Sequence, residues 1–578
     1  MIARTSWPPP DRAHQRYALL VDSLDDEHEQ LVVNGSVAAG RELDARLVVV
    51  AGGPVGAPDE RLRAGNFAFD LVGRDNSLGI LVLSSALGNI NGPQHLAQWL
   101  TRYDGMPLCC MGAPIPGRLS VRVDNATGIH EAVGHLVEVH GKQNIGFIRG
   151  PSQSEEAEVR YAAYREALVA RGISPDARWV AEGDYNRASG SQAVRTILDQ
   201  KRVSVHALDA LVCANDYMAL GVLDELGRRG INVPEQIALI GFDDLPSAAV
   251  ARPALTTIRQ PAGEQGREGL KQLLLLAAGA ALPSGDRVLP VELTIRRSCG
   301  CTALDFGLAP RPQGGGAVAS VEAALIQRRQ VIVAELARAA HGSFGAAGSD
   351  WESPLLSALI EEIRDSKQAA LSRRVQRLLL KLEQGGGDLA AAPLVLSTLR
   401  RQALACIPAH SEARDRLEDA MSDAQLLTTS MLNQTAVNMA RASMTRARAL
   451  ARQVQERMFG NPALVSRALA EHLPGLGIDA CVVASVVGKS ETEWRGQICF
   501  GFGPGKQHPD PTALPLSRLI DHPLVQASRT LFLLPITLGS EALGVAAFST
   551  ATLGKSDLLE DLRELFSTVL KVSQTRHG

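Results

Sequence analysis

The sequence predicts an α/β protein with two lobes, each a parallel sheet between helices, followed by an α-helical segment and a smaller α+β domain. Three observations predict this. Short apolar runs alternate with helical patterns from residue 16 to residue 300, a Pro/Gly-rich stretch ends that alternation, and the last part contains an apolar hairpin pattern. The 578 residues exceed what one hydrophobic core organises, so several domains are expected.

The first region, residues 16–300, contains the apolar runs "RYALLV", "ARLVVVAG", "GILVLSS", "NIGFIRG", "LDALVCA" and "QIALIGF". Their spacing leaves room for a helix between one run and the next. Strands that are apolar on both faces are typical of parallel sheets covered by helices. The runs are too many for one small sheet, so we expect two αβα lobes. Residues 1–15 are expected to be a disordered N-terminus.

Residues 301–318 are predicted to be a linker, because the Pro/Gly-rich stretch "APRPQGGGAVAS" begins within them. A helical segment is predicted to follow over residues 319–460. Within that segment apolar side chains recur at spacings of three and four. A parallel dimeric coiled coil and a solvated helix packed on a neighbour both fit this pattern. The repeating positions are Val437, Ala440, Met444, Ala447, Ala451, Val454 and Met458.

The last region, residues 461–578, begins with the helical pattern "NPALVSRALAEHL" and closes with the helical pattern "SDLLEDLRELFSTVLKVSQ". Between them, "TLFLLPITLGSEALGVAAFST" contains two apolar strands joined by "LGSEA". Two apolar strands joined by a short polar turn predict an antiparallel hairpin. An α+β domain is therefore expected.

Composition excludes several classes of function. The formal net charge is −3, so no excess of Lys and Arg indicates a nucleic acid or an anionic membrane as partner. The N-terminal residues lack a secretory signal pattern, and no apolar run reaches the length of about 18 residues that spans a membrane. We expect a cytoplasmic protein that does not contact a membrane.

The cysteines and histidines show no pattern typical of a metal site or a catalytic site. Eight cysteines are scattered, which in a reducing compartment indicates buried thiols rather than disulfides. The compact pair in "SCGC", residues 298–301, lacks the second pair of ligands that zinc needs, and no histidines have ligand spacing. No nucleophile with a base and no phosphate loop is visible. The expectation is a non-enzymatic protein without metal or cofactor.

Polar pairs follow two of the predicted strands in the second half of residues 16–300. Asn215-Asp216 ends the apolar run in "LVCANDYMALG", and Asp243-Asp244 ends the run in "IALIGFDDLP". Ligands bind beyond the carboxyl ends of strands in open α/β sheets. We expect Asp216 to cap the following helix and Asn215 to face a cleft with Asp243, whereas Asp244 has a structural role in its turn.

The same region resembles the effector-binding part of the LacI/GalR repressors, which are similar to periplasmic sugar-binding proteins. The matching blocks are "VRVDNATGIHEAVGHLVEVHGKQNIGFIRGP", "VRYAAYREAL", "EGDYNRASG" and residues 211–261, in the family's order. The resemblance implies a type I periplasmic-binding-protein-like fold with a three-stranded hinge that closes on a small ligand. The family's ligand contacts then fall on Asp124, Arg160, Tyr185, Asn215 and Asp243.

These residue types suit a hydroxyl-rich ligand. Arginine can bind two hydroxyls or a carboxylate, tyrosine offers a face to the apolar side of a sugar, and Asn or Asp can pair with ring hydroxyls. Ala262 stands where some members carry an aromatic ring, so a ligand other than a common hexose is compatible. Only residues 1–15 precede the first predicted strand, and no helix-turn-helix is visible in them, so the family's DNA-binding role is not carried over.

The C-terminal hairpin resembles that of GAF domains. Taken together, the predicted function is a small-molecule sensor that binds a sugar or a related polar metabolite and relays lobe closure through the helical segment to the GAF-like domain. A homodimer and a separate output protein are the expected partners. Two alternatives stay open: a scaffold or dimerisation protein that binds no ligand, and a transcriptional regulator that binds DNA through the arginine-rich segment 441–457.

Overall fold

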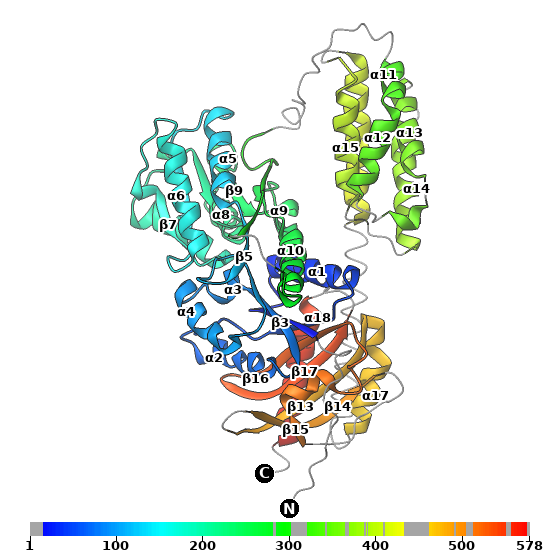
Figure 1. The fold of residues 1–578 in the computed structure, drawn as a ribbon. Coiled ribbons are helices and arrows are strands. Elements are labelled where there is room, and N and C mark those ends of the chain that lie inside the picture. Colours follow the sequence, from blue (N-terminus) through cyan, green and yellow to red (C-terminus); the bar gives the residue numbers. More distant parts are fainter. Residues whose placement is uncertain are drawn as a thin grey trace, which may run out of the picture. The chain divides into compact units, whose positions relative to one another are not determined.

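The computed structural model divides the chain into two compact units, one formed by Met1–Cys301 with Thr445–Gly578 and the other by Thr302–Met444 (Figure 1). Each unit is described by itself. The residues that the structure describes are 16–280, 285–301, 321–340, 344–348, 350–364, 369–385, 389, 391–408, 411–432, 462–490, 493–503, 513–550 and 556–574.

The first lobe has a parallel sheet in the order β11-β5-β4-β3-β1-β2. Helices α1 (Glu27–Glu42) and α10 (Ala262–Ala277) pack on one face, and short helices cover the other. The strands are β1 (Arg16–Val21), β2 (Leu47–Ala51), β3 (Ser77–Leu83), β4 (Leu108–Met111), β5 (Leu119–Val123) and β11 (Arg287–Leu289). The short helices are α2 (Glu60–Arg63), η2 (Asn66–Leu71), α3 (Ser84–Leu87), α4 (Gly92–Trp99) and η3 (Leu100–Tyr103).

The second lobe has the sheet order β12-β10-β9-β8-β6-β7, and every pair in it is parallel except β10 with β12. Its strands are β6 (Ile145–Arg149), β7 (Val180–Glu182), β8 (Ala210–Cys213), β9 (Ala238–Asp243), β10 (Thr256–Arg259) and β12 (Glu292–Thr294). Its main helices are α5 (Asn125–Glu138), α6 (Glu155–Val169), α7 (Arg187–Arg195), α8 (Asp216–Arg228) and α9 (Pro246–Val250). Two αβα lobes were predicted, and the structure contains both.

The chain crosses between the lobes three times. The crossings connect β5 to α5, β10 to α10, and β11 to β12. This is the three-stranded hinge that the resemblance implied. Because each crossing leaves from or arrives at the end of a strand, rotation about them can move one lobe while both sheets stay intact.

The C-terminal domain, residues 462–574, has an antiparallel sheet in the order β16-β17-β13-β14-β15. The predicted hairpin is present, with Gly539 at φ 61° in its turn, a left-handed conformation that glycine adopts without strain. The elements are α17 (Pro462–His472), β13 (Ile478–Lys489), β14 (Trp494–Phe502), β15 (Ala513–Pro515), β16 (Thr530–Leu538), β17 (Glu541–Thr550) and α18 (Ser556–Gln574).

The sheets of the first lobe and the C-terminal domain form one 11-stranded sheet. Edge strand β2 pairs in parallel with edge strand β16, from Leu47 opposite Thr530 to Val50 opposite Leu533. Alternate side chains of both strands enter two apolar cores, one on each face, that continue across the junction. The sequence predicted residues 16–300 and 461–578 as separate domains, and it contained no signal for this pairing between two edges far apart in the chain.

Arg16 closes one end of this junction. Its side chain is 1% exposed and donates to the carbonyl oxygens of Ser528 at 2.7 Å, Gln526 at 3.1 Å and Val525 at 3.3 Å. Burial is the main cause that lowers the pKa of Arg16 to about 10. The guanidinium therefore stays charged at neutral pH, and it donates hydrogen bonds to carbonyls of the residues just before β16.

The second unit is α-helical in its described residues. Its helices are α11 (Val321–Gln327), α12 (Arg329–Ala339), α13 (Glu352–Arg364), α14 (Ala370–Gln384), α15 (Ala392–Leu404) and a helix over residues 412–432. Leucine, isoleucine and alanine side chains from all of them share one core. The predicted heptad positions from 437 to 458 lie outside the described residues. In the described part of the chain, no helix has both the length and the apolar character needed to cross a membrane.

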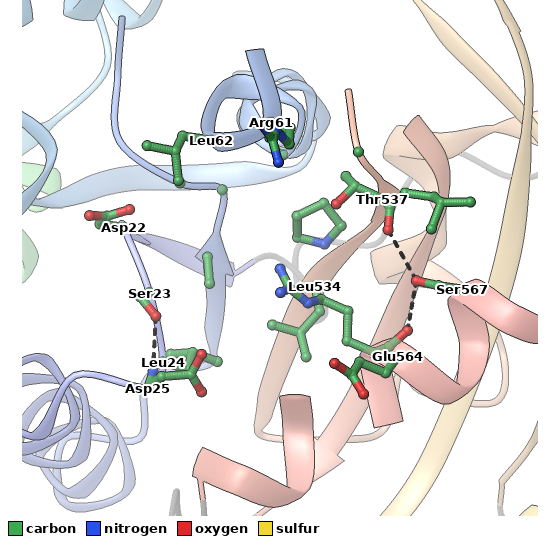
Figure 2. A pocket seen from close by; sticks show the side chains of 18 of the residues that line it. Asp22, Ser23, Leu24, Asp25, Arg61, Leu62, Leu534, Thr537, Glu564 and Ser567 are labelled. Atoms are coloured by element: carbon green, nitrogen blue, oxygen red, sulfur yellow. Dashed lines mark hydrogen bonds between the residues drawn. The ribbon is translucent and has the colours of Figure 1, made fainter. Parts of the chain in front are cut away.

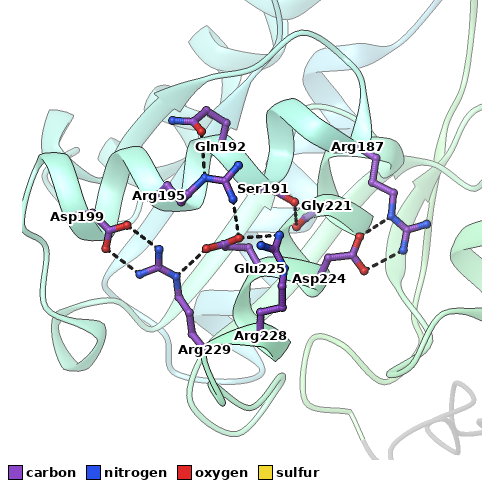
Figure 3. Close-up of polar contacts among 10 residues, drawn as sticks. All are labelled: Arg187, Ser191, Gln192, Arg195, Asp199, Gly221, Asp224, Glu225, Arg228 and Arg229. Carbon is purple, nitrogen blue, oxygen red and sulfur yellow. Dashed lines mark hydrogen bonds and ion pairs between the residues drawn. The ribbon is translucent and has the colours of Figure 1, made fainter.

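Helices α7 and α8 of the second lobe approach each other closely, because glycines stand at their contact. A Cβ at Gly221 would lie 1.9 Å from the carbonyl oxygen of Arg187, and the Ser191 hydroxyl donates to the Gly221 carbonyl at 2.8 Å. Beside this contact, arginines and acidic residues of both helices pair with one another (Figure 3). Glu225, which is 4% exposed, accepts from Arg195 at 2.8 Å.

Alanine at Gly221 should destabilise the protein, whereas alanine at Gly227 on the same helix should not. The new methyl at Gly221 overlaps a backbone oxygen, but nothing lies within 4 Å of the position at Gly227. We expect Gly221→Ala to lower the Tm by several degrees, and Gly227→Ala to stabilise by about 0.5 kcal/mol through helix propensity. Thermal denaturation of both variants measures this. Equal Tm values would contradict the close helix contact.

Removing the Arg16 guanidinium should weaken the junction between the first lobe and the C-terminal domain. Arg16→Met leaves one buried and two partly buried carbonyl oxygens without these donors, at a cost of about 3 kcal/mol. Arg46→Met is the matched control, because the half-buried Arg46 side chain donates to one of the same carbonyls, that of Gln526, at 2.8 Å. Limited proteolysis and Tm measurement should show a large effect for Arg16→Met and a small one for Arg46→Met. Equal effects of the two variants would contradict the role of Arg16 at this junction.

Candidate ligand-binding cleft

Polar side chains from both lobes surround a cavity of about 100 Å³ at the carboxyl ends of the strands. From the second lobe and the hinge it is lined by Glu156, Arg160, Tyr185, Asn215, Tyr217, Asp243 and Gln260. From the first lobe it is lined by Asp26, His28, Glu29, Ser85, Ala86 and Asn89. Four of the five predicted contact residues therefore meet at one cavity.

Arg160, on α6, is 3% exposed and held from two sides. Its Nε donates to Asn125 Oδ1 at 2.8 Å, and its Nη1 donates to the Ala214 carbonyl at 2.6 Å. The guanidinium carbon lies 3.8 Å from the centre of the Phe242 ring, in a cation–π contact. Among the described residues Nη2 has no hydrogen-bond partner, so a ligand in the cavity can use it.

Asn215 lines the cavity and also caps the following helix, the role that the prediction gave to Asp216. Asn215 is the N-cap of α8, because its Oδ1 accepts from the Met218 amide at 3.0 Å, while its Nδ2 donates to the Tyr185 carbonyl at 2.9 Å. Asp216 is fully buried and accepts from Thr257 Oγ1 at 2.6 Å. The prediction that Asp216 caps the helix is wrong, since its side chain points into the lobe.

Two residues that line the cavity, Tyr185 and Asp243, have a strained backbone, and so does Asp244, which follows Asp243 in the chain. Tyr185 has φ 53°, Asp243 has φ 128° and Asp244 has φ 63°, values that residues other than glycine rarely adopt. Such strain is typical of ligand sites, where the surrounding structure imposes it. Asp244 itself points to Arg259, at 2.7 Å, and to Arg296, so its structural role comes from ion pairs rather than from hydrogen bonds in its own turn.

The Tyr185 ring packs against backbone. A Cβ at Gly150 would lie 2.5 Å from this ring, so only glycine leaves room for it there. The Tyr185 hydroxyl lies 3.2 Å from Ser154 Oγ, the N-cap of α6. Burial is the main cause that raises the pKa of Tyr185 to about 12, so the hydroxyl is neutral and can donate.

Asp124 and Ala262 lie outside the residues that line this cavity. The Asp124 carboxylate caps α5 by accepting from the Thr127 amide at 3.1 Å. Ala262 begins α10 and is buried in the core of the first lobe, whereas its neighbour Gln260 lines the cavity and donates to Asp243. The family pattern therefore corresponds here to a helix cap and a core position.

The sequence analysis missed the wall that the first lobe contributes. Asp26, His28 and Glu29 follow β1 and begin α1. The same strand-end rule that selected Asn215 and Asp243 would have selected "DSLDDEHE" after β1. His28 Nε2 is buried without a hydrogen-bond partner in the described structure, and a ligand would supply one.

Direct contacts join the lobes at the rim of the cavity. The Tyr217 hydroxyl accepts from the Glu27 amide at 3.0 Å, and Glu27 Oε2 accepts from the Ser247 amide at 3.1 Å. Glu27 belongs to the first lobe, and Tyr217 and Ser247 belong to the second. These contacts hold the two lobes together at the rim of the cavity.

Burial raises the pKa values of several acids at the cleft. It raises the pKa of Asp243 to about 6, although His28 and Arg160 act in the opposite direction. Burial raises the pKa of Glu29 well above its usual value, and burial together with Asp26 raises the pKa of Asp22, a neighbour of Glu29 outside the cavity lining, to about 7. Concentrated buried acids of this kind are typical of functional sites.

A larger hollow of about 850 Å³ lies between the first lobe and the C-terminal domain, where Asp22, Arg61, Leu534 and Ser567 face it (Figure 2). Ser567 Oγ donates to the Thr537 carbonyl at 3.2 Å there. The hollow is wide and has few buried polar groups that converge on one point. The smaller cavity is the better candidate for a ligand site, because convergent polar side chains and a strained backbone coincide there.

The sequence predicted that the thiols of "SCGC" have no second pair of ligands near them. The structure contradicts this prediction. His135 and His140 lie beside Cys299 and Cys301, and one ligand atom of each lies within 4.8 Å of all the others. The second pair of ligands is 159 or more residues away in the sequence, so local spacing could not reveal it.

Comparison with known proteins agrees with this fold. Residues 133–299 match the family described as periplasmic binding protein-like domain. The HTH-type transcriptional repressor CytR of Escherichia coli strain K12 is 38% identical over 179 residues, 31% of this chain and 51% of CytR. The regulator CelR of Thermobifida fusca is 35% identical over 196 residues, 34% of this chain and 55% of CelR.

The E. coli regulator GalR is 31% identical over 210 residues, 36% of this chain and 60% of GalR. A solved CelR–cellobiose complex is 30% identical, with 50% of this chain and 86% of that chain covered at a TM-score of 0.43. The chain spans about half the length of the curated relatives it matches. The LacI/GalR-type resemblance is confirmed for residues 133–299, and these relatives are transcriptional regulators.

Replacing the buried Asp243 carboxyl should stabilise the ligand-free protein at neutral pH. The folded pKa of about 6 exceeds the ordinary value of 3.8, so the charged form costs stability that increases as the pH rises through this window. At pH 7.5, Asp243→Asn should raise the free energy of unfolding by an amount on the order of 2–3 kcal/mol, and with it the Tm. The gain should shrink near pH 4.5. Thermal denaturation at both pH values checks this. A gain that does not depend on pH would contradict the burial of a charged group.

Proposed function

We propose that the protein is a ligand-responsive regulator that binds a small hydroxyl-rich molecule, a sugar or a related polar metabolite, between its two lobes. The observation that carries the proposal is the convergence of Arg160, Tyr185, Asn215 and Asp243 on a cavity between the lobes. The His28 ring nitrogen without a partner in the opposite wall supports it.

The charges around the cavity favour a ligand rich in hydrogen-bond donors. Asp26, Glu29, Glu156 and Asp243 bring four carboxyl groups, against one guanidinium from Arg160. Carboxylates accept hydrogen bonds from hydroxyls, often two at a time. A neutral polyol or nucleoside-like molecule meets these acceptors without repulsion, whereas a phosphate or other anion would not.

Regulation, rather than catalysis, is the proposed role. The similar proteins are named as transcriptional regulators, and the segment they share with this chain includes the second lobe with its cleft residues. The proposal places the protein in the cytoplasm, where the sequence analysis expects it, and treats the C-terminal domain as GAF-like on its antiparallel sheet between α17 and α18.

The connectivity of the chain suggests how closure is relayed. Cys301, the last residue before the helical unit, packs in the core of the second lobe. After that unit the chain enters α17 of the C-terminal domain, whose sheet continues into the first lobe. One end of the helical unit is therefore connected to the second lobe, and the other end is connected to the C-terminal domain, which shares its sheet with the first lobe. A ligand that binds the closed form more tightly than the open form would change the distance between these attachment points.

Two outputs are compatible with such a relay. One is a partner protein that binds the helical unit or the C-terminal domain of a homodimer. The other is DNA, which the regulator names of the relatives favour, through the arginine-rich segment 441–457. Size measurement by light scattering tests the dimer, and salt-dependent mobility shifts separate the two outputs.

Ligand screening with matched variants tests the cleft. We expect a hit from a sugar and nucleoside library in thermal-shift and calorimetric assays on the full chain. Arg160→Met and Asp243→Asn should each weaken its binding at least tenfold, because both lose a buried contact with the ligand. Asp124→Asn is the control and should leave affinity within about twofold, since Asp124 caps α5 outside the cavity.

Two results would overturn the proposal. One is a hit whose affinity neither Arg160→Met nor Asp243→Asn changes, which would place the ligand elsewhere. The other is the absence of any hit together with a cleft that stays closed in small-angle scattering across the library, which would favour a scaffold that binds no ligand.

A further inference from the structure

We propose that His135, His140, Cys299 and Cys301 form a Cys₂His₂ site for a structural zinc ion in the second lobe. The site lies where the lobe ends and the chain passes on to the helical unit. It is separate from the ligand cleft, and the proposal is independent of the proposed function.

Four of the six distances between the ligand atoms match the edges of a tetrahedron around zinc, and all six lie within 4.8 Å. His135 Nε2 lies 3.2 Å from His140 Nε2 and 3.4 Å from Cys299 Sγ, and Cys301 Sγ lies 3.5 Å from His135 Nε2 and 3.4 Å from His140 Nε2. Zinc bonds of about 2.0 Å to nitrogen and about 2.3 Å to sulfur give tetrahedral edges of about 3.3 Å between nitrogens and about 3.6 Å between nitrogen and sulfur.

The end of helix α5 presents both histidines. His135 lies in its last turn, and the chain then turns back at Gly141, which has φ 64°. The Gly141 amide donates to the Val137 carbonyl at 3.0 Å, and the Lys142 amide donates to the Leu136 carbonyl at 3.0 Å. This glycine-terminated end places His140 beside His135, with both Nε2 atoms directed to one point.

The sheet of the same lobe holds the cysteines. Ser298 is fully buried between β9 and β10, where its Oγ accepts from the Thr256 amide at 2.8 Å and donates to the Leu239 carbonyl at 2.6 Å. Gly300 then turns the chain with φ 109°, and a Cβ there would lie 3.3 Å from His140 Nδ1. Glycine between the two cysteines thus lets both thiols face the imidazoles.

Three of the four ligands are buried, which favours a structural ion over a catalytic one. Cys299 is 0% exposed, Cys301 is 6% exposed and His135 is 9% exposed. Four protein ligands leave no open coordination position for water or substrate. Thiolates with imidazoles select zinc over magnesium and calcium, which prefer oxygen ligands.

Metal would fasten the carboxyl end of the second lobe to α5. The ligands are separated by 159 to 166 residues across the two pairs, so the ion closes a long loop in the folded lobe. It would also fix the position of Cys301, from which any movement of the lobe passes to the following residues.

Metal analysis of the full-length protein tests this. Protein purified without chelator should contain about one zinc per chain, measured by inductively coupled plasma mass spectrometry. Protein stripped of metal and titrated with Co²⁺ should develop the visible d–d bands and the thiolate charge-transfer band of a tetrahedral S₂N₂ site, and Zn²⁺ should abolish them. Chelation should lower the Tm of the lobe.

Ligand variants and matched controls assign the site. Cys299→Ser, Cys301→Ser, His135→Ala and His140→Ala should each retain less than about a tenth of the zinc. His130→Ala on the same helix and Cys406→Ser in the helical unit should keep about one zinc per chain. Circular dichroism of each variant shows whether it has folded, and the Co²⁺ spectrum of the unmodified chain decides the question if a variant does not.

Three outcomes would overturn the proposal. The first is a metal content well below one per chain with no tetrahedral Co²⁺ spectrum. The second is a mass two hydrogens lower under non-reducing conditions with no bound metal, which would show a Cys299–Cys301 disulfide. The third is zinc that the four ligand variants retain as fully as the controls, which would place the metal elsewhere.

Discussion

The parallel pairing of β2 with β16 is the constraint on which the arrangement of the first unit depends. Two edge strands, each of which would otherwise expose unpaired amides and carbonyls, satisfy each other. The side chains of both strands then alternate into two cores that run through the first lobe and the C-terminal domain. Arg16 closes one end of the pairing, where its charge offsets the loss of solvent around several carbonyls. The pair makes the first lobe and the C-terminal domain one body.

This junction determines which parts can move. The second lobe is joined to the first through three hinge crossings and through a few polar contacts at the rim, such as that of Tyr217 with Glu27. Opening the cleft therefore costs little apolar burial, whereas separating the C-terminal domain would break a sheet. Burial raises the pKa values of Glu29 and Asp243, which face the cleft, so their charged forms lower the stability of the folded protein.

Sequence reasoning predicted the second lobe better than the first. Strand ends that finish in Asn215 and Asp243 are local signals, and parallel strands bring their carboxyl ends to the same edge. The side chain that caps a helix depends on φ and ψ at the junction, and here Asn215 takes the cap that was expected of Asp216 while it also lines the cavity. Asp124 has the residue type of a ligand contact, but its position before α5 makes it a helix cap.

The resemblance to the LacI/GalR repressors implied the hinge of three crossings. The sequence by itself determined the elements and their class: strands apolar on both faces, helices between them and a C-terminal hairpin. These follow from periodicity and short-range turn chemistry. Only the tertiary structure decided the pairing of β2 with β16, the wall of the cleft around His28, and the meeting of His135 with Cys299. Each of these joins residues far apart in the chain, and their proximity depends on how the sheets and helices pack in three dimensions.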